Sequence, residues 1–201
     1  PDNLYPMLLI ELDDNSHDTE KGKDRDEFVE KILEKAGYKP YDDFMLCTDV
    51  AATEMYDAAT DKTIAANFTP SKMAGKKKCR EELLKEAGLP QCDVPVMGII
   101  SRLVEHKGFD LIKCVLDDIV QAGIKVVVLG SGEQQYEDFF AYMQGKYPEA
   151  VSFKCGYIPS YAKKIYAGAD MFLMPSKSEP CGLAQMIALR YGTVPIVRAT
   201  G

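Results

Sequence analysis

Residues 170–197 read DMFLMPSKSEPCGLAQMIALRYGTVPIV, and this stretch decides the fold that the sequence predicts. It opens on a short apolar run that Pro175 closes, as is typical of a strand buried in a parallel sheet. A helix over 182–191 and a second strand over 194–197 follow. Glu179 therefore lies beyond the carboxyl end of a strand and ahead of a helix, which is where open α/β sheets bind their ligands.

The same alternation of strand and helix extends back to residue 94. The predicted elements are strands over 94–100, 124–129, 151–153 and 171–174 and helices over 109–122, 133–146 and 159–168. Because a helix separates each strand from the next, we predict an α/β fold with a doubly wound parallel sheet. On the helix over 109–122, the side chains predicted to face the sheet are Leu111, Ile112, Val115, Leu116 and Ile119.

The composition excludes several classes of protein. Apolar residues make up 46% of the chain, which supports a real core, and 31 acidic residues against 24 Lys and Arg argue against non-specific nucleic-acid binding. No apolar run approaches the roughly 20 residues of a membrane span, so we expect no membrane partner. The six cysteines form no Cys-x-x-Cys pair, which predicts neither a zinc site nor a disulfide framework. We expect most of them to be small core residues in a reducing cytosol.

Upstream of the sheet, we divide the chain into an unassigned segment over 1–47 and an arm with an amphipathic helix over 48–92. The first segment contains a possible strand, a charged loop and a helical pattern, and we attach no function to it. In the second, the helix over 71–87 carries the run Lys76-Lys77-Lys78. The run could contact a polyanion, but acidic residues follow within a turn, so we interpret it as a solvated helix face. Residues 93–201 hold the predicted sheet.

Two loops after predicted strands carry residues suited to a phosphate or a close backbone contact. Arg102 and Lys107 flank the turn after the first strand and can converge on one diphosphate, although such loop cations more often face solvent. Gly130 and Gly132 follow the second strand, where glycine permits close approach to a ligand or simply a tight turn. NAD binding is not favoured, because Gln135 stands where a Gly-x-Gly-x-x-Gly fingerprint has its third glycine.

Glu179 itself has two interpretations. An acidic side chain near the first turn of a helix suits the helix dipole without any further function. Alternatively, Glu179 contacts a ligand, because the amides of Cys181 and Gly182 head the same helix and favour an anion or sugar hydroxyls. The residues alone leave both interpretations open.

Two motifs resemble a known family. Glu-Pro-Cys-Gly-Leu-x-Gln from Glu179, with Arg-Tyr-Gly-Thr-x-Pro from Arg190, is similar to the donor-site motif of bacterial glycogen synthases and plant starch synthases. The segment 101–108 resembles the phosphate-contact motif Gly-Arg-Leu-x-x-x-Lys-Gly of these enzymes apart from Ser101. They are retaining glycosyltransferases of the GT-B fold, so the resemblance implies the Rossmann-like C-terminal half of such an enzyme, incomplete at its end. It begins near residue 53, and we expect the chain to be a piece of a longer protein.

The resemblance implies a role for each candidate residue. Arg102 and Lys107 would bind the diphosphate of a nucleotide sugar and neutralise it as it leaves, which is electrostatic catalysis. Glu179 would accept hydrogen bonds from hydroxyls of the donor glucose, and Tyr157 would lie by the adenine ring. The other donor-binding candidates are Gly130, Gly132, Cys181, Gly182, Leu183, Thr200 and Gly201. Ile187 stands where many GT-B enzymes carry a second Glu, which favours the starch synthase branch.

The implied reaction transfers glucose from ADP-glucose to the non-reducing end of an α-1,4-glucan with retention. The resemblance implies no metal and no cofactor other than the substrate, a glucan acceptor held by a part of the enzyme not recognisable here, and a cytoplasmic location, or a plastid in a plant or alga. Two alternatives remain. One is a non-catalytic Rossmann-like nucleotide-binding or interaction module. The other is a retaining glycosyltransferase that uses another nucleotide sugar, such as UDP-glucose.

Overall fold

A computed structural model describes residues 56–179 and 181–198. The chain divides into two units, Pro1–Met55 and Tyr56–Gly201, and the described residues all belong to the second. Predictions for the segment 1–47 lie outside the described residues, as do the candidates Thr200 and Gly201.

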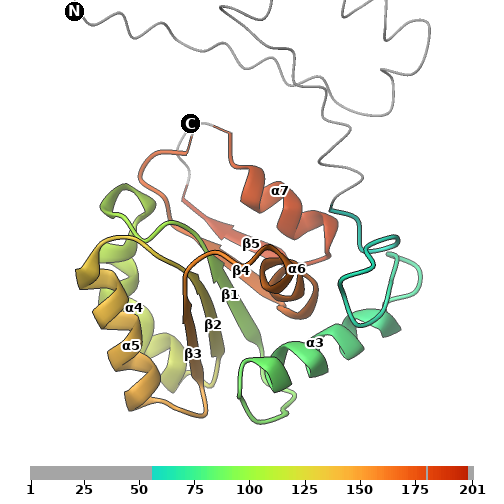
Figure 1. The fold of residues 1–201 in the computed structure, drawn as a ribbon, viewed down its shortest axis with the longest axis horizontal. Helices are drawn as coiled ribbons and strands as arrows, with labels where there is room; N and C mark the ends of the chain where they lie inside the picture. Colours follow the sequence, from blue (N-terminus) through green and yellow to red (C-terminus); the bar gives the residue numbers. More distant parts are fainter. Residues whose placement is uncertain (1–55, 180, 199–201) are drawn as a thin grey trace, which may run out of the picture. The chain divides into compact units, whose positions relative to one another are not determined.

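Five parallel strands and five α-helices make up the described unit (Figure 1). The helices are α3 (Ala74–Glu86), α4 (Phe109–Gln121), α5 (Gln134–Lys146), α6 (Pro159–Gly168) and α7 (Leu183–Arg190), with a short 3-10 helix η2 (Glu105–Lys107). The strands are β1 (Val96–Ile100), β2 (Lys125–Gly130), β3 (Val151–Cys155), β4 (Met171–Met174) and β5 (Val194–Val197). The predicted alternation of strand and helix is confirmed, and so is the incomplete Rossmann-like α/β fold.

The strand order is β3-β2-β1-β4-β5, and each neighbouring pair is parallel. The chain therefore runs outward from β1 through β2 to β3 and then returns across the sheet to β4. This reversal places a topological switch point between β1 and β4. In open α/β sheets, ligands bind outside the carboxyl ends of the strands at such a point. Here that position is formed by the loops after β1 and after β4.

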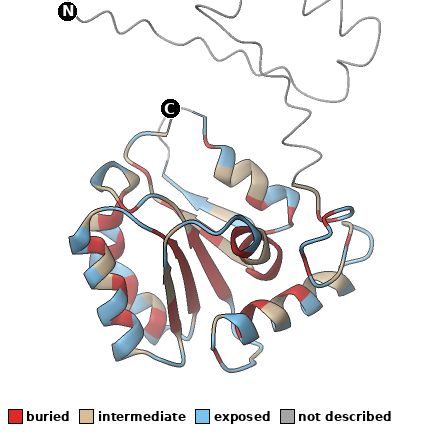
Figure 2. Cartoon of the chain, in the orientation of Figure 1, coloured by how far each residue is buried: buried red, intermediate tan, exposed pale blue. Residues whose placement is uncertain are grey.

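Both faces of the central strands β1 and β2 are covered, which explains their continuous apolar sequences, whereas edge strand β5 is largely exposed (Figure 2). Successive strand residues point to opposite faces. Met97 and Ile99 pack in one core cluster with α4 and α5, whereas Val96 packs in a second cluster with α3 and α6. Each large apolar side chain buried in this way contributes roughly 1.5–3 kcal/mol to folding.

The prediction for the inward side of α4 is partly wrong. Leu111 and Val115 are 42% and 43% exposed. The buried residues of α4 are Phe109, Ile112, Leu116 and Val120. These four residues are spaced three or four apart, so they form one narrow stripe along the helix, which is what a helix lying on one face of a sheet can bury. The sequence offers a wider apolar face than the single sheet contact uses.

The prediction for the cysteines is also wrong. Among the cysteines that the structure describes, Cys79 is buried and Cys92 is half-buried, whereas Cys114, Cys155 and Cys181 are exposed. The exposed cysteines lie on an outer helix face, at the end of edge strand β3 and in the loop before α7. In the same part of the chain, His, Cys, Asp and Glu side chains form no group of three or more suited to a metal ion, and none of the helices is long and apolar enough to cross a membrane.

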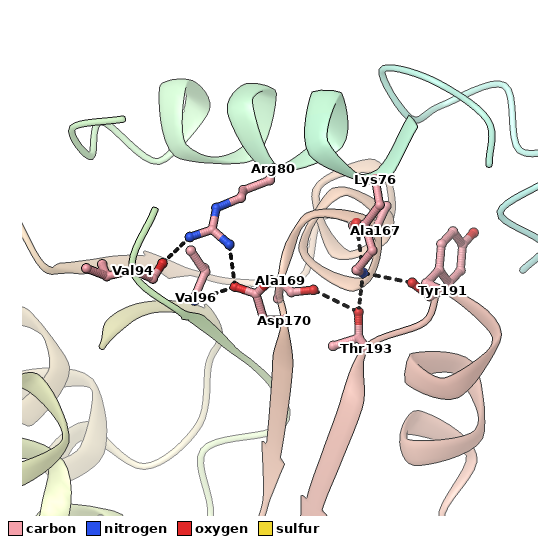
Figure 3. A network of polar contacts seen from close by, with 9 residues as sticks. All are labelled: Lys76, Arg80, Val94, Val96, Ala167, Ala169, Asp170, Tyr191 and Thr193. Carbon is pink, nitrogen blue, oxygen red and sulfur yellow. Dashed lines mark hydrogen bonds and ion pairs between the residues drawn. The ribbon is translucent and has the colours of Figure 1, made fainter. Parts of the chain in front are cut away.

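The interpretation of Lys76-Lys77-Lys78 as a solvated face is wrong for Lys76 (Figure 3). Its ammonium donates to the carbonyl oxygens of Ala167 and Tyr191 at 3.1 and 2.8 Å and to Thr193 Oγ1 at 2.9 Å. Burial lowers the pKa of Lys76 to about 8. The hydrogen bonds of Lys76 therefore link α3 to the ends of α6 and α7 and to the start of β5.

Arg80, one turn further along α3, anchors the helix to the amino ends of β1 and β4 (Figure 3). It pairs with Asp170 Oδ2 at 2.6 Å and also donates to the Val94 carbonyl. Asp170 Oδ2 in turn accepts the backbone N–H of Val96 at 2.7 Å. These contacts lie at the edge of the sheet opposite the switch point and hold the domain together there.

Candidate functional site

The loops after β1 and after β4 meet at the switch point. Lys177 N–H donates to the carbonyl oxygen of His106 at 2.8 Å. Gly108 has a φ of 81°, and a Cβ at this position would lie 2.1 Å from the Pro175 carbonyl oxygen. A glycine is therefore required at 108, both for the left-handed backbone and for the close approach of the two loops.

The loop contact brings two of the predicted catalytic residues together. Lys107 Nζ lies 2.6 Å from Glu179 Oε2, and the two side chains are only 18% and 17% exposed. Ser176 Oγ, whose residue is buried, donates to the same carboxylate oxygen at 3.1 Å. Residues 72 positions apart in the sequence thus form one charged pair at the carboxyl edge of the sheet.

The environment of Glu179 keeps its carboxylate ionised. Burial on its own raises the pKa of this carboxyl. The hydrogen bonds from Lys107 and Ser176 and the charge of Lys107 act in the opposite direction and outweigh burial, so the pKa of Glu179 is lowered from its ordinary value. The carboxylate is therefore available at neutral pH as a hydrogen-bond acceptor.

Arg102 lies on the same loop but is exposed. No residue in the described part of the chain forms an ion pair or hydrogen bond with its guanidinium. Its five donors are therefore open to an anion, and the fork geometry of a guanidinium matches phosphate oxygens. The structure places Arg102 and Lys107 five residues apart around η2, as predicted from the sequence.

Sequence reasoning missed Lys177 as a second ionic link between the two loops. Lys177 Nζ lies 2.8 Å from Asp110 Oδ2 at the start of α4 and 3.3 Å from Glu105 Oε1 in η2. The hydrogen bond from Lys177 lowers the pKa of the Asp110 carboxyl. A basic residue in the loop after a strand and an acidic residue in the first turn of a helix were the available signal, but nothing local in the sequence pairs them.

Gly130 and Gly132 serve the packing of the neighbouring loop. A Cβ on Gly130 would lie 2.1 Å from the Ser101 carbonyl oxygen, and one on Gly132 would lie 2.3 Å from that of Leu103. Leu103 and Gly132 also form a parallel β-bridge. The backbone of the loop after β1 therefore packs closely against the backbone of the loop after β2. Donor contact by these two glycines stays a prediction.

The remaining candidates lie on neighbouring loops of the same edge. Tyr157, between β3 and α6, is 67% exposed. Gly182 caps α7 with a φ of 65°, Cys181 beside it is exposed, and Leu183 begins the helix with 52% of its surface exposed. The backbone N–H of Gly182 donates to the Glu179 carboxylate, so the start of α7 lies at the same site, where helix N-terminal amides favour an anion.

Together, these residues offer two cations, one carboxylate and a helix N-terminus at the switch point of a parallel sheet. That combination is suited to a ligand with both a polyanionic part and hydrogen-bond-donating hydroxyls, and it lies where open, Rossmann-like α/β domains bind their ligands. The family described as "Glycosyl transferases group 1" matches residues 80–201, and the chain belongs to this family. A second family, described as "Protein of unknown function (DUF2726)", matches residues 1–40.

The curated relatives confirm the predicted resemblance. Glycogen synthase from Kosmotoga olearia is 53% identical over 146 residues, which are 73% of this chain and 31% of the relative. Glycogen synthase from Clostridium acetobutylicum is 50% identical over 149 residues, with 74% and 31% covered. The chain thus spans 31% of the length of these relatives.

Among solved structures, the catalytic domain of starch synthase IV from Arabidopsis thaliana, bound to ADP and acarbose, is similar with a TM-score of 0.66 and 34% identity. The match covers 73% of this chain and 31% of that structure. The likeness extends the sequence resemblance to the three-dimensional arrangement of the sheet and its helices.

Proposed function

We propose that this chain is the donor-binding part of a glycogen or starch synthase that uses ADP-glucose. The Lys107–Glu179 pair at the switch point carries the proposal, because it joins a phosphate-binding cation to a hydroxyl-binding carboxylate. The identity of about 50% to two glycogen synthases and the ADP in the similar starch synthase structure support it. The whole enzyme would extend an α-1,4-glucan at its non-reducing end with retention, in the cytoplasm or in a plastid.

In this proposal, Arg102 and Lys107 hold the diphosphate and stabilise the negative charge that develops on it as the bond to the sugar breaks. Glu179 accepts hydrogen bonds from glucose hydroxyls and thereby orients the sugar. Tyr157 lies against the base, and the amides at the start of α7 contribute further donors. ADP-glucose enters as the substrate, and the proposal includes no metal and no separate cofactor.

Calorimetric titration of the folded chain with ADP, UDP and NAD in parallel tests the proposal. We expect ADP to bind in the micromolar to millimolar range and the other two to bind at least about tenfold more weakly, which corresponds to roughly 1.4 kcal/mol. A preference for UDP would favour a glycosyltransferase with another donor, such as UDP-glucose. Absence of binding by a chain shown to be folded would favour a non-catalytic interaction module.

A further inference from the structure

Two groups with different ligand preferences contact each other directly at the switch point. Lys107 attracts phosphate, whereas Glu179 accepts hydrogen bonds from hydroxyls and repels phosphate. Their 2.6 Å contact is largely shielded from solvent, since each side chain is less than one fifth exposed. It therefore differs from the many exposed ion pairs that solvent screens and that contribute little.

A phosphate bound by Lys107 would lie close to Glu179. A phosphate oxygen that accepts a hydrogen bond from Lys107 Nζ shares this nitrogen with Glu179 Oε2, so the two negatively charged groups are held within a few ångströms of each other. Glu179 cannot easily turn away, because Ser176 Oγ holds the same oxygen at 3.1 Å. A bare diphosphate at this position faces an ionised carboxylate across a shared ammonium.

A sugar attached to the diphosphate changes how Glu179 affects binding. Its hydroxyl groups are hydrogen-bond donors, and a partly buried carboxylate with spare acceptor capacity is stabilised by them. The same carboxylate thus opposes one ligand and favours the other. We propose that Glu179 is a specificity-determining residue that makes the site select a glycosyl diphosphate over a free nucleoside diphosphate or inorganic pyrophosphate.

This inference rests on the proposed function and adds to it a direction of selectivity. A site built in this way binds the intact donor and releases the nucleotide that remains after the sugar has been passed on. Neutralising Glu179 without changing its shape should abolish this preference. It should also improve the binding of bare diphosphates, which is the opposite of what loss of an ordinary binding residue does.

The test compares the wild-type chain with Glu179→Gln by calorimetric titration of ADP-glucose, ADP and pyrophosphate. We expect Glu179→Gln to bind ADP and pyrophosphate roughly three- to tenfold more tightly and ADP-glucose more weakly, so that the ratio of the two nucleotide affinities falls at least about tenfold. Asp138→Asn is the matched control, because it makes the same change in net charge at an exposed position on α5. Glu179→Asp, which withdraws the carboxylate from Lys107, serves if Glu179→Gln does not fold.

The outcomes separate this inference from the proposed function. We expect the Asp138→Asn control to bind ADP and pyrophosphate like wild type. If Glu179→Gln also binds them like wild type, or more weakly, the role of Glu179 in selection is overturned. Tighter binding of pyrophosphate by Glu179→Gln, with no binding of ADP to any variant, supports that role and overturns the nucleotide assignment.

Discussion

The chemistry of the site depends on how Lys107 and Glu179 influence each other. The folded-state pKa of Glu179 lies below its unfolded value of about 4.3, so the pair stabilises the fold above that pH and this contribution is lost as the pH falls through the folded-state pKa. Lys107→Met removes the cation and leaves the burial, which raises the pKa of Glu179 relative to wild type. A carboxyl ¹³C NMR titration measures this change.

The control for this titration is Lys85→Met, which removes a lysine from the last turn of α3. It should leave the Glu179 titration unchanged. The free energy of unfolding gives an independent check, since the difference between wild type and Lys107→Met should shrink as the pH falls below about 4. A Glu179 pKa that is the same in wild type and Lys107→Met would contradict the pairing seen in the structure.

Arg102 permits a sharper test of the phosphate assignment, because its side chain is exposed and has little part in stability. Arg102→Ala should weaken ADP binding about 10- to 100-fold, the range for loss of one charge-assisted hydrogen-bonding group, while the thermal midpoint stays unchanged. Calorimetry measures the affinity. Lys77→Ala removes an exposed cation from α3, outside the donor-site motifs, and should leave ADP affinity intact. Equal ADP affinity in both variants would disprove the assignment.

Single residues show what the sequence could and could not predict. Lys107 and Glu179 were predicted separately from motifs, but their 2.6 Å contact was not, because 72 residues separate them and only the strand order brings their loops together. The burial of Lys76 could not be predicted from the sequence either. Its charge and the acidic residues after it are typical of a solvated helix face, and the carbonyl oxygens that accept hydrogen bonds from its ammonium lie on distant elements.

At the scale of elements, apolar periodicity predicts each described α-helix and strand to within a few residues, whereas the short 3-10 helix η2 lies in a segment predicted as a loop. The predicted helix over 71–87 begins three residues later, at Ala74, and the strand over 151–153 extends to Cys155. Periodicity could not predict which part of a broad apolar face becomes buried. On α4, the stripe through Ile112 and Leu116 meets the sheet, and Val115 is left exposed. Contacts with neighbouring elements, rather than the helix itself, determine which part of the apolar face is buried.

The attachment of α3 gives an element-scale prediction. Lys76 has a pKa of about 8 in the folded chain, below the unfolded value of about 10.4, because burial disfavours its charge. The unfolded chain therefore binds more protons between these pH values, and the contribution of Lys76 to stability rises as the pH increases from about 8 to 10. In Lys76→Met this rise disappears. The difference in unfolding free energy between wild type and variant should change by roughly 3 kcal/mol across this range.

Urea unfolding at several pH values between 7.5 and 10.5 measures that difference. The neighbouring Lys77 is exposed and provides the matched control, since Lys77→Met should give a curve parallel to wild type. Parallel curves for Lys76→Met and wild type would show that the Lys76 ammonium is not buried among the carbonyl oxygens of α6 and α7.

At the scale of the whole molecule, the predicted residues come from four different loops at one edge of the sheet, and two of these loops meet at the switch point. The sequence predicted that edge, because each candidate follows a strand. The divisions at 47 and 92 stay predictions, although the arm from Tyr56 packs in the same unit as the sheet, where Ile64 and Phe68 join a core cluster with Tyr191.

For a protein of these 201 residues, donor binding and glucose transfer can be measured separately. Transfer requires an acceptor hydroxyl held against the reacting carbon of the donor, and positioning of this kind supplies a large part of the rate of such reactions. The described residues supply the proposed donor-side groups around a single sheet, and the chain spans 31% of the length of its glycogen synthase relative from Kosmotoga olearia. We therefore expect ADP binding without elongation of glycogen from labelled ADP-glucose, in an assay where the complete Kosmotoga olearia enzyme is active. Label that enters the polymer in proportion to the added chain, and is lost with Glu179→Gln, would show instead that this chain also provides an acceptor site.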